Sequence, residues 1–277
     1  MIEFDYGLDI NNFFNGSAER NALEAAGDFF ESRLLDDLAA IIPIGGMNTW
    51  SASFTNPGTG SLTSVPNLTV PQRTLKVFVG GRNVFSGLAE TSIGGFNVSG
   101  SSDWVATVSN RDQATTRGPT ATDVGIWGGA ISFDSTTNWH FGTSTAGLES
   151  NEFDFYSVAL RQLGRLLGIG TSSSWNNLVD PLGPRFAGAR SVAEYDFPGE
   201  PALTSDFQNW ANGVTDGGEL PAMGGDLLPG TRRSFTDLDL AALADIGWTL
   251  ESTAVPEPGF FPILVVTIAG ACIVRAR

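Results

Sequence analysis

The sequence is poor in the residues that most often bind metals, and in charged residues generally. Among its 277 residues there is one histidine, His140, and one cysteine, Cys272. Because Cys272 lies in the apolar C-terminal tail, the body of the chain can form neither an internal disulfide nor a thiolate metal site. Charged residues make up 16% of the chain, below the roughly 25% of average domains. We therefore expect many turns and strands and few long, solvated helices.

Positive charge is scarcer still, with 15 Lys and Arg against 30 Asp and Glu, which gives a net charge of −15. A phosphate backbone would be repelled, so we expect no nucleic-acid partner. The acidic residues form no long block, so their excess requires no role beyond solubility. The first ten residues, MIEFDYGLDI, have neither the basic region nor the apolar run of a secretory signal peptide.

Apolar periodicity predicts the main elements of the first half of the chain. Residues 17–42 repeat apolar side chains at helical spacing, and Ser17 is a suitable N-cap. Strands are expected from about residue 48 to residue 134, most clearly at 73–81. Two clusters of Gly, Ser, Thr and Asn, at 56–64 and 92–103, indicate loops.

The second half should contain two further helices, at 152–169 and 235–248, separated by an irregular stretch rich in Gly and Pro. Thr236 is a suitable N-cap for the last helix, and Gly247 suits the turn that follows it. The helix count predicted from sequence is therefore three.

The C-terminal tail differs in composition from the rest of the chain. Residues 251–258 form a polar, Pro-rich linker, and an uncharged apolar run follows. The run is slightly shorter than the about 20 residues of a full span, but two terminal arginines can snorkel to an interface. We therefore expect a single transmembrane helix within 259–277, which would be the chain's contact with a membrane. Its basic end would stay cytoplasmic and the large N-terminal body would lie outside.

The order of the tail carries a resemblance. The residues concerned are Val255, Pro256, Glu257 and Pro258, then the apolar run, then Arg275 and Arg277. This tail resembles the PEP-CTERM sorting signal of bacterial exported proteins. The resemblance implies export, transient membrane anchoring, cleavage by an exosortase-type processing enzyme, and release to the cell surface or an exopolysaccharide matrix. Because such proteins carry an N-terminal signal peptide, we expect the true start to lie upstream of Met1.

The stretch SVALRQLGRLLGIGTSSSW (157–175) has the frame of the zinc motif H-E-x-x-H-x-x-G-x-x-H. Aligned on Gly168, the ligand and base positions hold Arg161, Gln162, Arg165 and Thr171. Met223 in LPAMGG matches the methionine turn that follows this motif, and FTDLDLAALADIGW (235–248) matches the closing helix. Most of residues 1–250 thus resembles the matrixin-like group of metzincin metallopeptidases.

That resemblance implies an α+β, zincin-type fold in one domain, residues 1–250. A twisted, mostly parallel sheet with one antiparallel edge strand should pack against the helices at 17–42 and 152–169. It also implies that the ancestral zinc is lost. A guanidinium has no lone pair to donate and stays protonated, the amide of Gln162 cannot act as a general base, and Thr171 is a poor ligand. We expect no zinc or other cofactor, and we interpret His140 as a structural residue near Trp139.

Three functions remain open at this point. The first is an exported pseudoenzyme with a non-catalytic binding or scaffold role. The second is a working hydrolase with a relocated site, for which the nearby carboxylates are Asp134, Glu149, Glu152 and Asp154. The third is a decayed, non-functional paralogue.

Arg161 and Arg165 lie one helical turn apart, so both should face the former metal cleft. Two cations on a half-buried face need partners. The simpler expectation is an internal salt bridge to Glu149, Glu152 or Asp226. The alternative is an anion-binding pocket, because guanidinium suits bidentate capture of carboxylate or sulfate, and an acidic exopolysaccharide would then be a candidate ligand.

Overall fold

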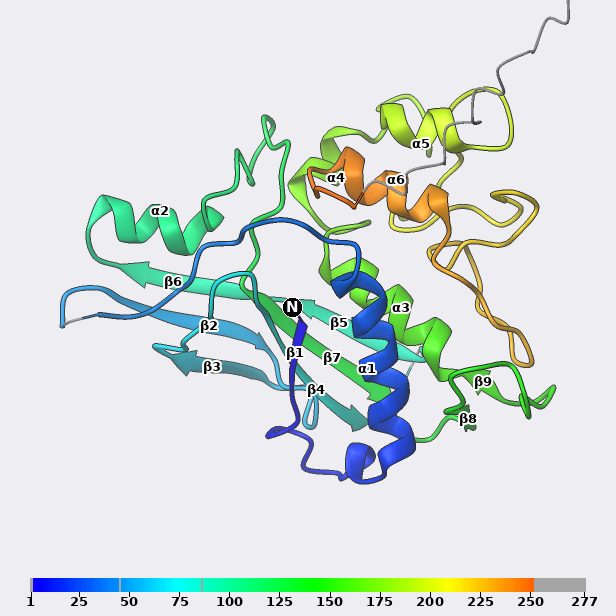
Figure 1. The fold of residues 1–277 in the computed structure, drawn as a ribbon, viewed down its shortest axis with the longest axis horizontal. Coiled ribbons are helices and arrows are strands. Elements are labelled where there is room, and N and C mark those ends of the chain that lie inside the picture. The colour runs from blue at the N-terminus through cyan, green and yellow to red at the C-terminus, as the bar shows by residue number, and fades with distance from the viewer. Residues whose placement is uncertain (1, 45, 86, 252–277) are drawn as a thin grey trace, which may run out of the picture.

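The computed structural model describes residues 2–44, 46–85 and 87–251. Its main sheet has the strand order β1-β4-β7-β5 (Figure 1). The strands are β1 (Ile2–Asp5), β4 (Leu75–Arg82), β7 (Gly128–Asp134) and β5 (Ala89–Ile93). The first three are parallel, whereas β5 runs antiparallel to β7. The sheet is therefore mixed, and β5 forms one of its edges.

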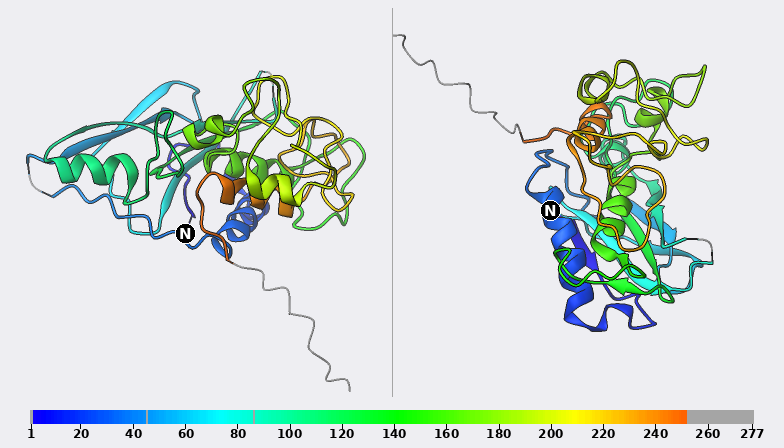
Figure 2. Two further views of the ribbon diagram at one scale, coloured as in Figure 1. Left: turned by 90° about the horizontal axis from the view of Figure 1, so that it is seen from above. Right: turned by 90° about the vertical axis from the view of Figure 1, so that its right-hand side faces the viewer.

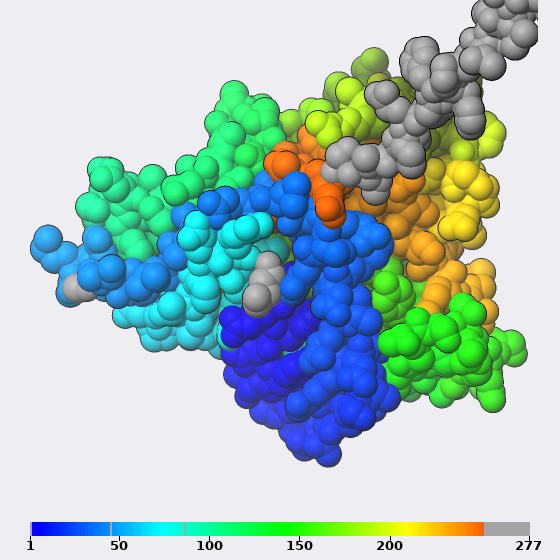
Figure 3. Space-filling view, in the orientation of Figure 1, coloured from blue at the N-terminus to red at the C-terminus, as the bar shows by residue number. Residues whose placement is uncertain are grey.

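The two central strands are covered on both faces, which explains their nearly continuous apolar sequences. One face is covered by α1 (Ser17–Glu31) and α3 (Phe155–Leu166), which cross in front of the sheet in Figure 1. Leu23 and Phe30 of α1 are fully buried in the same core as Leu160 of α3. In the space-filling view, α1 hides most of α3 from this side (Figure 3).

The opposite face carries a second, antiparallel sheet of β2 (Thr49–Thr55), β3 (Leu62–Pro66) and β6 (Gly95–Ser99), in the order β3-β2-β6. Burial alternates along β2, as expected for a strand with one face in a core. The Phe54 ring of β2 stacks on Phe78 of β4, with centroids 4.5 Å apart. The helix α2 (Ser102–Asn110) contributes Trp104 and Val108 to this core.

The remaining elements are short and surround α3. They are the 3-10 helix Phe13–Asn15, β8 (Trp139–His140), β9 (Phe153–Asp154), α4 (Ser173–Asn177), α5 (Ala189–Glu194) and α6 (Asp237–Asp245). The last three helices gather at one end of the molecule, opposite the second sheet and α2 (Figures 1 and 2).

Several boundaries differ from the sequence expectations. The helix predicted over 17–42 ends at Glu31, and its N-cap is Gly16, with Ser17 as the first helical residue. The prediction ran too far because Leu38 and Ile41 continue the apolar spacing of the helix. Both side chains are buried, but they lie in non-helical segments. The predicted loop at 92–103 contains β6, whose short, polar alternation hid it. Thr236 is confirmed as the N-cap of α6, and Gly247 has a φ of 119°.

The fold class predicted from the sequence therefore needs correction. The prediction was a metzincin-like domain with three helices and a C-terminal transmembrane helix. The structure is α+β, but its described residues form six α-helices and a separate antiparallel sheet that the prediction lacked. Across the described part of the chain, no helix is both long and apolar enough to cross a membrane. The predicted span at 259–277, with the sorting motif before it, lies outside the described residues.

Candidate functional site: an arginine-lined cleft

A cleft of about 840 Å³ lies beside α3. One wall is formed by residues 87–91 and 93, which include most of the edge strand β5. The other wall consists of the loop segments 204–209 and 225–227, and α3 contributes Arg161, Gln162 and Arg165 between them. Both arginines thus line the same cleft.

The two guanidiniums converge on a single oxygen. Arg161 Nη2 donates to Asn209 Oδ1 at 2.9 Å, and Arg165 Nη2 donates to the same oxygen at 2.8 Å. Arg161 Nη2 also donates to the Gly224 carbonyl at 2.6 Å, and Arg165 Nη1 donates to Gln208 Oε1 at 2.7 Å. We call Arg161, Arg165, Gln208 and Asn209 the arginine cluster. Neutral oxygens, and no carboxylate, are its acceptors.

The loop 204–209 is positioned by contacts behind the cluster. The Thr204 amide donates to the Asn209 carbonyl at 2.9 Å, which closes the loop. Trp175 Nε1 donates to the Phe207 carbonyl at 2.9 Å. Gly170 has a φ of 74°, and a Cβ there would lie 2.3 Å from the Gln208 carbonyl oxygen. Only glycine at this position allows the loop to approach α3 closely enough for Gln208 and Asn209 to reach the arginines.

The predicted salt bridge is wrong. In the described ranges, none of Glu149, Glu152 and Asp226 comes within 4.0 Å of either guanidinium, nor does any other carboxylate. Asp226 instead has its backbone carbonyl bound by Arg233 Nη2 at 2.5 Å. Glu149 and Glu152 are near the arginines in sequence but do not line the cleft, whereas Asp226 lines it without forming an ion pair with either arginine.

Burial destabilises both cations, and the charges of neighbouring arginines add to this effect at Arg161. The pKa of Arg161 is lowered to about 10, chiefly by burial and then by the charges of Arg165 and Arg233. Burial also lowers the pKa of Arg165, an effect that the carboxylate of Asp206 opposes. Guanidiniums with such values stay protonated at neutral pH. The cleft therefore holds two positive charges that no ion pair neutralises within the described residues.

Part of the donor capacity of the cluster is unused. Arg161 Nε and Nη1 and Arg165 Nε have no acceptor among the described residues. The only fully buried side-chain atoms without a partner there are Glu19 Oε2 and Thr236 Oγ1. The three arginine nitrogens are therefore accessible to solvent, and they can donate to a ligand in the cleft.

The other two positions of the aligned motif serve structure. Gln162 is buried, and its Oε1 accepts a hydrogen bond of 2.7 Å from Thr91 Oγ1 on β5. Thr171 Oγ1 donates to the Arg165 carbonyl at 2.7 Å and so caps the end of α3. Gly168 between them has a φ of 114°, a conformation that requires glycine at this turn.

Met223 lies fully buried beneath α3, where a Cβ on Gly164 would be 2.8 Å from its Sδ. Its backbone carbonyl accepts from the Trp210 amide at 2.9 Å, and Trp210 Nε1 donates to Asp239 Oδ1 at 2.7 Å. Asp239 is completely buried, and burial raises its pKa to about 7. This network holds Asn209 and Gly224, the neighbours of Trp210 and Met223, against Arg161. Sequence reasoning found Met223 but missed Asn209, Trp210 and Asp239, because no local pattern marks them.

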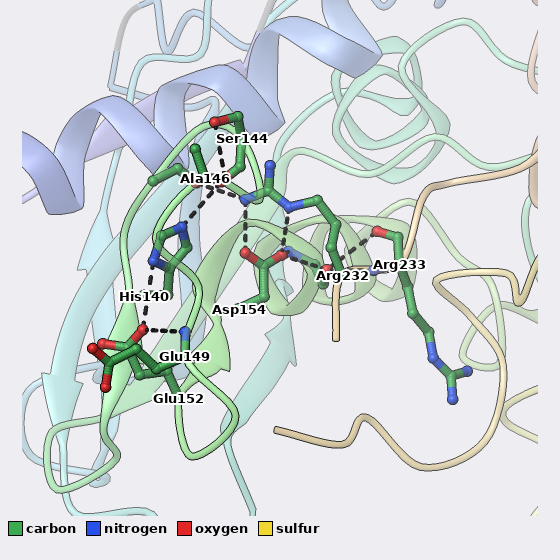
Figure 4. Close-up of polar contacts among 10 residues, drawn as sticks. His140, Ser144, Ala146, Glu149, Glu152, Asp154, Arg232 and Arg233 are labelled. Carbon is green, nitrogen blue, oxygen red and sulfur yellow. Dashed lines mark hydrogen bonds and ion pairs between the residues drawn. The ribbon is translucent and has the colours of Figure 1, made fainter. Parts of the chain in front are cut away.

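His140 and the nearby carboxylates form a separate, structural group (Figure 4). His140 Nδ1 lies 3.6 Å from Glu152 Oε2, and Nε2 lies 3.0 Å from the Ser144 carbonyl. Asp154 forms an ion pair with Arg232, with a shortest distance of 2.6 Å. None of these residues lines the cleft.

Asp134 also has its acceptors occupied. Its carboxylate accepts from the Val84 amide at 2.9 Å and from the hydroxyls of Thr136 and Thr137, at 2.7 Å each. Together with the His140 group, it fixes the loop between β7 and α3. Over the described residues, no group of three or more His, Cys, Asp or Glu side chains could hold a metal ion.

Comparison of the chain with protein-family models, curated proteins and solved structures finds no match. What the site can do must therefore be argued from its own geometry, which is that of a cleft with two unneutralised guanidiniums and open N–H donors.

Proposed function

We propose that the protein is a non-catalytic relative of the matrixin-like metallopeptidases and that its cleft binds an anionic ligand. One observation carries the proposal: Arg161 and Arg165 share Asn209 Oδ1 as acceptor, no described carboxylate neutralises them, and three of their nitrogens remain open. Two half-buried cations without an ion-pair partner carry a desolvation cost in a folded protein. An anion in the cleft would remove that cost.

The side chains in the cleft argue against the chemistry of the resembled family. A catalytic zinc needs three protein ligands with available lone pairs. The positions aligned with the two helical histidines hold cations, which repel a divalent cation. The position aligned with the general base holds an amide that is already bound to Thr91. The proposal therefore assigns binding, not hydrolysis, to this cleft.

The expected ligand carries a carboxylate or sulfate group. Guanidinium N–H groups bind such oxyanions in short, charge-assisted hydrogen bonds. The acidic surface of the chain, with its net charge of −15, will weaken the binding of polyanions at low salt. Because Asp206 and Asp226 also line the cleft, a single anionic group reaching the arginine cluster is favoured over a densely charged polymer.

The test is to titrate the full chain with sulfate and with acetate and to measure binding by calorimetry or NMR. The double variant Arg161→Gln plus Arg165→Gln should lose binding. The matched control is Arg185→Gln plus Arg190→Gln, which removes the same charge from exposed positions outside the cleft lining. Equal affinity in the wild type and the cleft variant would refute the proposal.

We further propose that the tail is a sorting signal recognised by an exosortase-type processing enzyme, and that the protein is exported to the cell envelope or its matrix. The support is the order of Pro256, Glu257, Pro258, the apolar run and the terminal arginines. Deleting residues 256–277 should abolish processing and leave the melting temperature of the body unchanged. Unaltered localisation and processing of the truncated chain would contradict this assignment.

A further inference from the structure

A second, smaller cavity adjoins the arginine-lined cleft. Its volume is about 170 Å³, and it shares two lining residues with the cleft, Ile93 and Thr171. Apolar side chains dominate its inner wall, namely Phe96, Ile126, Trp127 and Leu166. An engineered apolar cavity of about 150 Å³ is known to bind benzene. The second cavity is therefore large enough for one aromatic ring.

The linings of the two spaces are neighbours on α3 and β5. Arg165 lines the cleft, and the next residue, Leu166, lines the second cavity. Thr171, whose hydroxyl is bound to the Arg165 carbonyl, stands at the boundary. Ile93 at the end of β5 forms the other side of this boundary and is 37% exposed. A single ligand that contacts both the arginine cluster and the apolar cavity would cross this boundary at Ile93 and Thr171.

Two charged side chains line the second cavity, and both have contacts within the protein. Asp123 accepts from the Val124 and Ala114 amides, at 2.7 and 3.0 Å. Arg117 lies over the Phe96 ring, with its guanidinium carbon 4.4 Å from the ring centroid. Because Arg117 also lines this cavity, its guanidinium is a second donor that a ligand carboxylate could reach, besides the open N–H groups of the cleft.

From this arrangement we infer that the ligand is a small aromatic carboxylate. Its carboxylate binds the open N–H groups of Arg161 and Arg165, and its single ring occupies the 170 Å³ cavity beyond Ile93 and Thr171. The inference rests on the proposed anion binding and adds the chemical class of the ligand. It predicts that neither half of the ligand alone binds as well as the whole.

The experiment compares 3-phenylpropionate, phenylacetate, acetate and benzyl alcohol by calorimetry on the full chain. The better of the two aromatic acids should bind about 10- to 100-fold tighter than acetate, the gain expected for burying one ring. The double variant Arg161→Gln plus Arg165→Gln should abolish binding of both acids. Asn209→Asp places an internal carboxylate between the arginines and should also abolish binding of both acids. This variant serves as the test if the double variant does not fold.

Two phenylalanine variants isolate the ring site. Thr116 lines the second cavity, so Thr116→Phe should fill it and remove the advantage of the aromatic acids while acetate binding persists. Thr120→Phe, exposed in the same loop and outside the lining, is the control and should bind like the wild type. Melting temperatures of both variants confirm that they are folded.

The outcomes separate the two proposals. If acetate and sulfate bind but the ring adds nothing, or if Thr116→Phe leaves aromatic affinity unchanged, the ligand class is refuted and anion binding stands. If none of the anions binds, the proposed function itself fails. If Arg117→Gln, and not the cleft variant, removes the carboxylate contribution, the acid group lies on the wrong side of Thr171 and the inference is overturned.

Discussion

At the scale of single residues, the site depends on Asn209. Its Oδ1 accepts a hydrogen bond from each guanidinium. This fixes the orientation of the side-chain amide, because a flipped amide would place its NH₂ donor against two N–H donors. The sequence predicts that Arg161 and Arg165 face one cleft, since helical spacing alone determines it. It cannot predict their acceptor, which lies 48 and 44 residues further along the chain in a stretch without regular structure.

Substitutions of Asn209 test its role. Asn209→Ala should lower the free energy of unfolding by about 1.5–3 kcal/mol, the range for a lost hydrogen bond to a charged group. Asn209→Asp should instead form internal ion pairs and abolish anion binding. Urea denaturation and a sulfate titration measure the two effects. Asn151→Ala, at an exposed position, is the control, and an Asn209→Asp variant that still binds sulfate would contradict this role.

Asp239 gives the fold a distinct pH dependence. Its pKa is about 7 in the folded chain, against an ordinary value of 3.8, because it is completely buried. Between these values the folded chain holds a proton that the unfolded chain has released, so stability falls as pH rises from about 3.8 and the loss is complete at about 7.

The free energy of unfolding should therefore fall more steeply from pH 5 to pH 8 in the wild type than in Asp239→Asn. Denaturation curves at several pH values give both slopes. Asp237→Asn, an exposed change in the same turn of α6, should keep the wild-type slope. Parallel curves for the wild type and Asp239→Asn would show that Asp239 does not titrate in this window.

At the scale of elements, the site is built by one helix and one irregular loop. The frame of α3 could be predicted because its apolar residues repeat at helical spacing. The loop 204–209 could not, because its position depends on a close approach to Gly170 and on the bond from Trp175 to the Phe207 carbonyl. Short elements could not be predicted from the sequence for a related reason. The strand β6 alternates small polar residues with Phe96 and Val98, and it is recognisable only beside β2.

The loop's dependence on Gly170 can be measured. Gly170→Ala places a Cβ 2.3 Å from the Gln208 carbonyl oxygen, so it should displace the loop and weaken anion binding as well as stability. Gly213→Ala is the matched control. Its φ of 91° implies comparable backbone strain, yet its Cβ would meet no atom within 4 Å. The measurement is the sulfate affinity of the two variants, which should be lower in Gly170→Ala than in Gly213→Ala. Equal affinities would show that the loop tolerates the added Cβ.

At the scale of the whole molecule, the charge distribution is the unusual feature. A chain with a net charge of −15 retains two cations in the lining of the cleft, and among the described residues neither forms an ion pair with an acid. The composition predicts the acidic surface but not the positive charge of the cleft. That charge depends on where the chain brings α3 and the loop 204–209 together. The two-sheet architecture supports the cleft by burying both faces of the central strands and leaving β5 at its edge.

The central claim is that the arginine cluster has replaced a metal site, and metal analysis tests it most directly. The full chain and the combined variant Arg161→His, Gln162→Glu, Arg165→His and Thr171→His are purified with zinc present, and their zinc content and proteolytic activity are measured. The variant restores i and i+4 histidines and should recover zinc binding. The wild type should contain no stoichiometric zinc and show no chelator-sensitive proteolysis. One tightly bound zinc per wild-type chain, with proteolysis that a chelator abolishes, would contradict the account.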